Sequence, residues 1–218
     1  MGWIAGFYRS TIGRKIVMAA TGLLLVGFVA AHMTGNLLIF RGRDAFDAYS
    51  HFLQGLGGLL WLGRGILLAS LLLHVHSAWT LTRQAQAARI DGYAESDPRA
   101  ATRSARAMRW GGVLLLVFIV YHIFHLTVGS VHPDFRRGEA YGNVMTGLGV
   151  SWVALFYLAA MGALALHLRH GVSSLFQTLG VNHPHLNPVF AKVATALAFV
   201  VPLGFAAVPL AVLFGLVR

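Results

Sequence analysis

Seven of the eleven histidines in this 218-residue chain interrupt long apolar runs: His32, His74, His76, His122, His125, His167 and His170. Imidazole is the commonest metal ligand among side chains, and it can also pass protons. Ionisable groups within apolar segments are costly to bury and usually functional. These seven positions are therefore the candidate site.

Five apolar runs must position these histidines, and each is long enough to cross a bilayer as a helix, which takes about 20 residues. We expect these helices at about 15–40, 56–81, 110–131, 144–175 and 188–217. Hydrophobic residues make up 57% of the chain and charged residues 11%, whereas about a quarter of a soluble domain is charged. The expected fold is an all-α membrane protein, a single integral membrane domain over residues 1–218.

Composition excludes several kinds of chemistry. The chain has no cysteine, which removes disulfides, thiolate zinc sites, iron–sulfur clusters and thiolate haem ligation. Its net charge of +10 suits basic loops beside anionic lipid headgroups better than a nucleic-acid partner. The first apolar run is too long for a cleavable signal peptide.

Basic residues predict the orientation of the helices. With the N-terminus in the cytoplasm, eleven of the seventeen lysines and arginines lie on the cytoplasmic side, as the positive-inside rule favours. His32, His122 and His125 then lie toward the outer face, on the first and third helices. His74, His167 and His170 lie toward the cytoplasmic face, on the second and fourth helices.

Two such layers are what haem b with two histidine ligands requires, because the iron takes axial nitrogens from opposite faces of a flat porphyrin. A helix bundle can supply them from facing helices, here the first four. His76 lies about 200° around its helix from His74, so the two cannot serve one haem. His125 and His170 follow His122 and His167 by one turn and are candidates for ligands, for partners of the ligands or for contacts to the haem propionates. His51, His132, His183 and His185 lie in polar segments, where a role in a solvated loop or an interface is expected.

Five short segments resemble one known family. They are residues 12–22 (IGRKIVMAATG), 31–37 (AHMTGNL), 73–78 (LHVHSA), 120–127 (VYHIFHLT) and 166–171 (LHLRHG). Together they resemble the cytochrome b subunit of succinate:quinone oxidoreductases, the membrane anchor of succinate dehydrogenase and fumarate reductase. The likeness is to the single-anchor, di-haem b558 type and covers essentially the whole chain.

The resemblance implies one axial ligand from each of the first four helices. His32 and His122 would hold the outer haem, and His74 and His167 the haem nearer the cytoplasm. His125 competes with His122, which we favour because its spacing better matches the family pattern. Arg14, Lys15 and Arg109 would meet propionates or a partner, or serve as ordinary positive-inside anchors.

The resemblance also implies partners and a location. The family's anchor binds an iron–sulfur subunit, which binds an FAD-containing flavoprotein that carries out the dicarboxylate chemistry. The chain would lie in the bacterial cytoplasmic membrane and pass electrons to quinone, with menaquinone as the expected substrate. The family's low-potential members use an intramembrane glutamate near the outer haem. Here Glu95 and Glu139 are the only glutamates, and both lie in polar segments.

Two other functions remain open from the sequence. One is a haem b anchor of another respiratory complex, of the hydrogenase or formate dehydrogenase type. The other is a haem-free transporter that uses its histidines as a proton relay. The partner proteins distinguish the first alternative, and the absence of a haem absorption band would identify the second.

Overall fold

The computed structural model describes residues 2–88, 100–181 and 183–217, and of residues 100–107 it describes the backbone alone. Within these ranges every regular element is helical, which confirms the expected all-α class. Five segments are long and apolar enough to cross a membrane. Their helices are α2 (Thr11–Asn36), α4 (Gly58–Ala87), α5 (Ala100–His122), α7 (Ser151–Thr178) and α8 (Asn187–Leu213).

Two of these spans continue in a different helical geometry. A 3₁₀ turn, η1 (Leu37–Arg41), extends α2, and a π-helix, η2 (Ile123–Val128), extends α5. The π-helix ends at Gly129, whose φ of 85° lies in the left-handed region and whose N–H donates to the carbonyl of Phe124. Glycine takes this conformation without steric cost, and any Cβ here would overlap the ring of Phe135.

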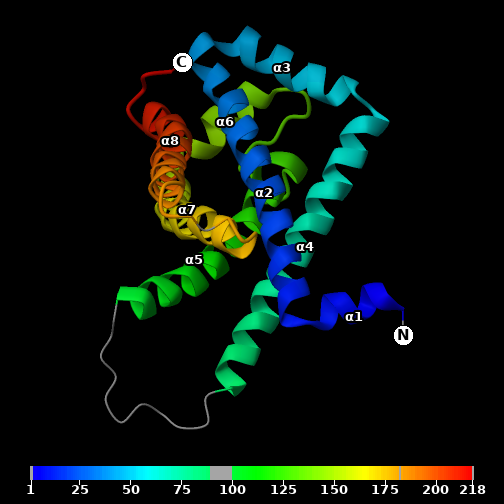
Figure 1. The fold of residues 1–218 in the computed structure, drawn as a ribbon. Helices are drawn as coiled ribbons and strands as arrows, with labels where there is room; N and C mark the ends of the chain where they lie inside the picture. Colours follow the sequence, from blue (N-terminus) through cyan, green and yellow to red (C-terminus); the bar gives the residue numbers. More distant parts are fainter. Residues whose placement is uncertain (1, 89–99, 182, 218) are drawn as a thin grey trace.

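The polar stretch between the first two expected spans forms a further helix that the sequence did not predict, α3 (Arg43–Gly55). Its apolar side buries Phe46, and its Asp47 carboxylate accepts a hydrogen bond of 2.8 Å from the backbone N–H of Tyr141. Amphipathic spacing in a short polar segment therefore makes an interfacial helix. Figure 1 shows α3 lying across one end of the bundle, near the C-terminus, and α1 (Trp3–Arg9) at the other end.

The expected helix over 144–175 is divided in two. A short helix, α6 (Ala140–Leu148), comes first, and α7 begins at Ser151. Between them Val150 is extended, with φ −78° and ψ 111°. Elsewhere α5 begins at Ala100, ten residues before the expected start, and α4 continues to Ala87, six residues beyond the expected end. α8 ends at Leu213, four residues before the expected end.

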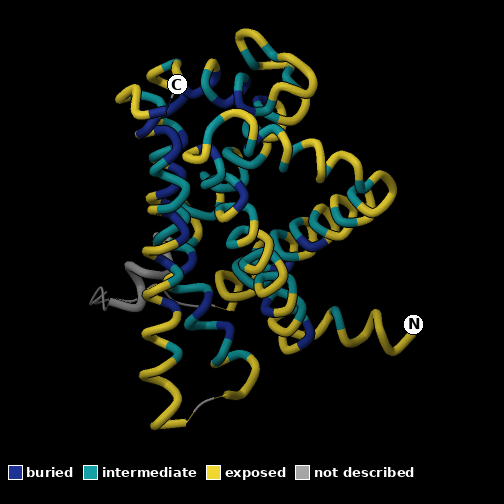
Figure 2. The backbone as a smooth tube through the Cα atoms, turned by 90° about the horizontal axis from the view of Figure 1, so that it is seen from above, coloured by how far each residue is buried: buried dark blue, intermediate teal, exposed yellow. Residues whose placement is uncertain are grey.

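Packing is uneven around the bundle. α7 packs against α5 and α8, and α2 packs against α4, α7 and α8. One apolar core lies where α7 and α8 meet η1, α3 and α6, and includes Ile39, Tyr141 and Tyr157. A second core joins α7 and α8 to the middle of α2. Figure 2 shows buried positions concentrated in part of the molecule, while α1, next to the N-terminus, has no buried residue.

Candidate metal centre

The first histidine pair consists of His32 on α2 and His122 on α5. The ring centroids of His32 and His122 lie 5.9 Å apart, with an angle of 74° between the ring planes. Phenylalanine rings surround the pair: Phe28 stacks on His32 at 5.4 Å and Phe118 on His122 at 5.7 Å. Phe205 of α8 lies 5.7 Å from His32. The two imidazoles therefore meet in an apolar setting.

The second pair joins α4 and α7. The ring centroids of His74 and His167 lie 6.3 Å apart, with an angle of 57° between the planes. The Nδ1 atom of His74 is 3.1 Å from the carbonyl oxygen of Met18 and 3.3 Å from the hydroxyl of Thr21, both on α2. A carbonyl can only accept, so His74 donates from Nδ1 and keeps a lone pair on Nε2. This is the tautomer in which a histidine ligates a metal through Nε2.

Both pairs have the spacing of two imidazoles that share one metal ion. A metal–nitrogen bond is about 2 Å long and each ring centroid lies about 1 Å beyond its nitrogen, which places the two centroids about 6 Å apart. In the described part of the chain, neither α2 with α5 nor α4 with α7 belongs to the helix pairs whose backbones pack closely. Each histidine pair thus bridges two helices that are otherwise separated. The residues present fit a haem with two axial histidines in each layer.

The donor set does not fit a compact metal cage. Among the described residues no three histidine or carboxylate side chains converge on one point, whereas a structural zinc site takes four protein ligands. The two pairs also lie far apart, because Gly22 faces His74 and His32 follows ten residues later on the same helix. At 1.5 Å per residue, that separates the layers by about 15 Å along α2.

His125 lies beside the first pair but does not face His32. Its ring is fully buried and packs on Tyr121 at 5.2 Å and on His132 at 5.0 Å. Its Nδ1 atom is 2.9 Å from the hydroxyl of Tyr157, which also lies 3.2 Å from Nδ1 of His122. The change from α-helix to π-helix after His122 alters the angular spacing of the two histidines, so His122 faces His32 and His125 faces His132 in the loop after η2.

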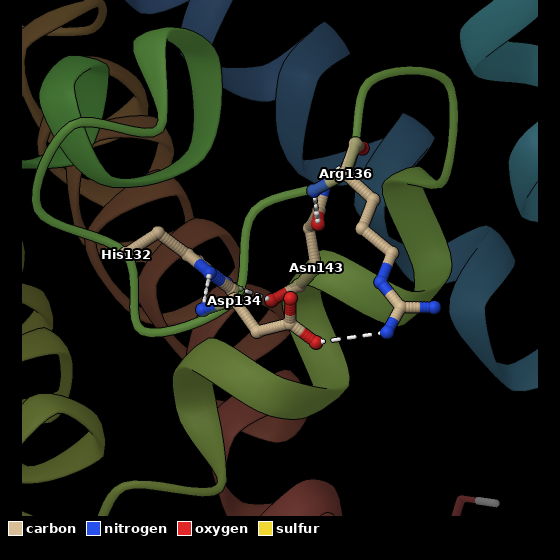
Figure 3. A network of polar contacts seen from close by, with 4 residues as sticks. All are labelled: His132, Asp134, Arg136 and Asn143. Atoms are coloured by element: carbon tan, nitrogen blue, oxygen red, sulfur yellow. Dashed lines mark hydrogen bonds and ion pairs between the residues drawn. The ribbon is translucent and has the colours of Figure 1, made fainter.

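His132 lies in the loop after η2, where specific hydrogen bonds hold it. Its Nε2 atom is 2.8 Å from the carbonyl oxygen of Asn143, and its Nδ1 atom accepts from the N–H of Asp134 at 3.0 Å. Figure 3 shows these residues together with Arg136, whose backbone exchanges two hydrogen bonds with the Asn143 amide. The Arg136–Asp134 ion pair is exposed and adds little stability. His132 is therefore held in one tautomer by its two partners.

The other three histidines outside the membrane-spanning helices agree better with expectation. His51, His183 and His185 are exposed. The Nε2 atom of His51 lies 3.0 Å from the carbonyl oxygen of Gly138.

Other candidate residues lie outside the two pairs. His76 is exposed and bonds through Nδ1 to the hydroxyl of Tyr8 at 2.6 Å, which ties α4 to α1. His170 is half-buried on α7. Arg14 is half-buried and its buried Nε has no hydrogen-bond partner in the structure, while Lys15 and Arg109 are exposed.

Three residues adjoin the histidines without any signal in the sequence pattern. Tyr157 carries no spacing signal, because only the approach of α7 to α5 brings its hydroxyl to His122 and His125. His132 lies in a polar loop. Gly22 makes room for a ring, because an added Cβ there would lie 3.2 Å from His74.

Comparison with known proteins gives one match. The family model of the succinate dehydrogenase/fumarate reductase transmembrane subunit matches residues 96–206, just over half of the chain. No curated protein matches the chain, and no solved structure matches it. The matched segment carries His122, Tyr157 and His167.

Proposed function

Because the chain belongs to the family of succinate dehydrogenase/fumarate reductase transmembrane subunits, we propose that it is the di-haem cytochrome b anchor of such a complex. In this proposal it relays electrons between the iron–sulfur subunit and quinone in the membrane. His32 and His122 are the axial ligands of the outer haem b, and His74 and His167 are those of the inner one.

The observation that carries this proposal is the pair of imidazole contacts. Ring centroids at 5.9 Å and 6.3 Å match the spacing of two ligands on one metal ion, about 6 Å. Each pair also joins helices whose backbones do not pack closely on one another. Two separate sites with the same arrangement, about 15 Å apart along α2, support two haems better than a chance meeting of polar side chains.

Each haem, when bound, supplies a one-electron carrier whose potential depends on its ligands and surroundings. The chain's own residues hold it and tune it. The Met18 carbonyl orients His74, and the Tyr157 hydroxyl adjoins His122. Phe28, Phe118 and Phe205 keep water from the outer pair. Burial and hydrogen bonds to the ligands are the usual means of setting such potentials.

The proposed partners follow from the family to which the chain belongs, and its composition agrees with them. Without cysteine it cannot provide the thiolates of an iron–sulfur cluster, and its apolar spans leave no soluble catalytic domain in the described residues. We assign dicarboxylate chemistry to an FAD-containing flavoprotein, joined through an iron–sulfur subunit on the cytoplasmic side. That side carries the N-terminus and most basic residues, in the bacterial cytoplasmic membrane. Arg14, Lys15 and Arg109 are proposed contacts to haem propionates or to the partner, and menaquinone is the proposed quinone.

A reduced-minus-oxidised absorption spectrum with a pyridine haemochrome count tests this proposal. The sample is the complex purified from membranes with a tag on this chain, and its subunits are identified by mass spectrometry. Two b-type haems per chain, with an iron–sulfur protein and a flavoprotein, are expected. A well-folded preparation without haem would refute it, and a hydrogenase or formate dehydrogenase as partner would refute the assignment to this complex.

A further inference from the structure

One hydroxyl group stands between two histidines. The Tyr157 oxygen lies 3.2 Å from Nδ1 of His122 and 2.9 Å from Nδ1 of His125. A tyrosine hydroxyl has a single hydrogen and two acceptor lone pairs, so it can donate to only one of these nitrogens. The described residues offer this hydroxyl no further hydrogen-bond partner, so its hydrogen is used when it donates to one histidine and accepts from the other. In that arrangement the two histidines carry their hydrogens on different nitrogens.

The direction of this hydrogen-bond chain follows if His122 is a metal ligand through Nε2. A neutral imidazole that ligates through Nε2 carries its hydrogen on Nδ1. His122 then donates to the Tyr157 oxygen, and the Tyr157 hydroxyl donates to Nδ1 of His125. His125 in turn carries its hydrogen on Nε2, a buried atom for which the described residues provide no hydrogen-bond partner.

His132, which lies beyond His125, is held by hydrogen bonds of its own. His132 stacks on His125 with ring centroids 5.0 Å apart and planes inclined by 27°. The Asn143 carbonyl can only accept from Nε2 of His132, and the Asp134 N–H can only donate to its Nδ1. These two hydrogen bonds fix the ring of His132. His125 stacks on that ring and bonds to Tyr157, so His132 helps to keep both residues in place.

We propose that Tyr157 is a positioning residue for His122, and that His125 acts through Tyr157 and is not itself an iron ligand. This inference rests on the proposed function, because it assigns a role toward the outer haem. By accepting the Nδ1 hydrogen, the Tyr157 oxygen orients the ring of His122 and increases the basicity of its Nε2 atom. Donation from Tyr157 to His125 strengthens that acceptance, since hydrogen bonds in a chain polarise one another.

The inner pair differs in a way that makes the proposal testable. His74 donates to the backbone carbonyl of Met18, and the buried Nδ1 atom of His167 has no hydrogen-bond partner in the structure. Tyr157 bonds to neither of these histidines. A change at Tyr157 should consequently affect the outer haem alone.

Redox titration of the complex that carries Tyr157→Phe, followed by visible absorption, is the test. Phenylalanine keeps the ring but cannot accept the Nδ1 hydrogen, so the ferric outer haem loses stabilisation. We expect two haems per chain, an upward shift in the midpoint potential of one haem, and an unchanged potential for the other. The shift should persist in a His74→Ala background, in which only the outer haem is expected.

Tyr121→Phe is the matched control. Tyr121 lies on the same helix as His122 and stacks on His125, but among the described residues its hydroxyl has no hydrogen bond to a histidine. Both potentials should equal those of the unaltered complex. Two haems with unaltered potentials in Tyr157→Phe would overturn the inference and leave the proposed function standing, as would equal shifts in both haems.

His125→Leu decides the case if Tyr157→Phe loses a haem. Here the Tyr157 hydroxyl remains but loses its acceptor, so the same haem should shift upward by a smaller amount while both haems are retained. An outer haem potential equal to that of the unaltered complex, or loss of the outer haem from His125→Leu, would overturn the inference. Absence of haem from the unaltered complex would instead refute the proposed function.

Discussion

The Nδ1 atom of His74 lies 3.1 Å from the carbonyl oxygen of Met18. The acceptor belongs to the backbone of α2, so no side-chain substitution that preserves this helix removes it. His122, in contrast, has a side chain as its partner, the hydroxyl of Tyr157 at 3.2 Å. The two histidine pairs therefore share a spacing but differ in how their rings are oriented, and the outer pair is the one that a single substitution can tune.

Removing one ligand should remove one haem. We expect His74→Ala or His167→Ala to lose the inner haem and retain the outer one in part, because a single axial imidazole leaves the iron under-ligated. His32→Ala or His122→Ala should do the reverse. The measurement is the haemochrome count per chain, with His76→Ala as a control that keeps both haems. Two haems in His74→Ala or in His167→Ala would refute the inner assignment.

A side chain at Gly22 should disturb the inner pair. A Cβ there would lie 3.2 Å from Cε1 and 3.5 Å from Nδ1 of His74, so the branched side chain of Gly22→Val must displace the ring. We expect loss of the inner haem or a change in its absorption band. Gly27→Ala is the control on the same helix, since its Cβ would meet nothing within 4 Å. It should leave both haems and stabilise α2 by up to about 1 kcal/mol.

Gly147→Ala should destabilise the outer end of the bundle. Its Cβ would lie 2.7 Å from Nε2 of His125 and 2.8 Å from Nε2 of His132, which forces the two stacked rings apart. Overpacking of this kind costs about 1–3 kcal/mol, measured as a lower midpoint of thermal unfolding in detergent by circular dichroism. Gly162→Ala, where a Cβ has open space, should unfold at or slightly above the original temperature. Equal midpoints for the two variants would show that the His125 and His132 rings can move apart without a loss of stability.

Asp47 should act as a cap for α6 from a distant part of the chain. Its carboxylate accepts from the N–H of Tyr141 in the first turn of that helix, at 2.8 Å. Asp47→Ala should lower the free energy of unfolding by about 1–2 kcal/mol, as the loss of a cap does. Asp47→Asn keeps an acceptor oxygen and should lose less. Asp44→Ala provides the comparison, because Asp44 is an exposed residue of α3, the helix that carries Asp47. An equal loss of unfolding free energy in Asp44→Ala would argue against the capping role.

Parts of the candidate site could be predicted because they depend on distance along a helix. A histidine's depth follows from its number of residues past the membrane surface, at about 1.5 Å each. His32 and His122 therefore share a layer once the helices alternate in direction, as do His74 and His167. The rings that adjoin in the structure come from these layers. Tyr157 could not be found in this way, because a tyrosine in an apolar helix is ordinarily a packing residue.

Helix α3, Arg43–Gly55, had no counterpart among the expected helices for a related reason. Its Phe46 is buried, its Asp47 accepts from the N–H of Tyr141, and its Arg43 guanidinium lies over the Tyr141 ring, 5.3 Å from the centroid. Whether a short polar segment becomes a helix depends on an apolar surface to pack against, and that surface belongs to residues about a hundred positions later.

Composition and residue spacing predict the five spans and the relative depth of each histidine, since a bilayer demands long apolar helices with all backbone groups bonded internally. Only the packed structure shows that His125 faces Tyr157 and His132 rather than His32, and that His132 is held in the loop network. These outcomes depend on the rotation of each helix about its axis and on the change to π-helix after His122. Both are set by packing between segments far apart in the chain, which local spacing does not encode.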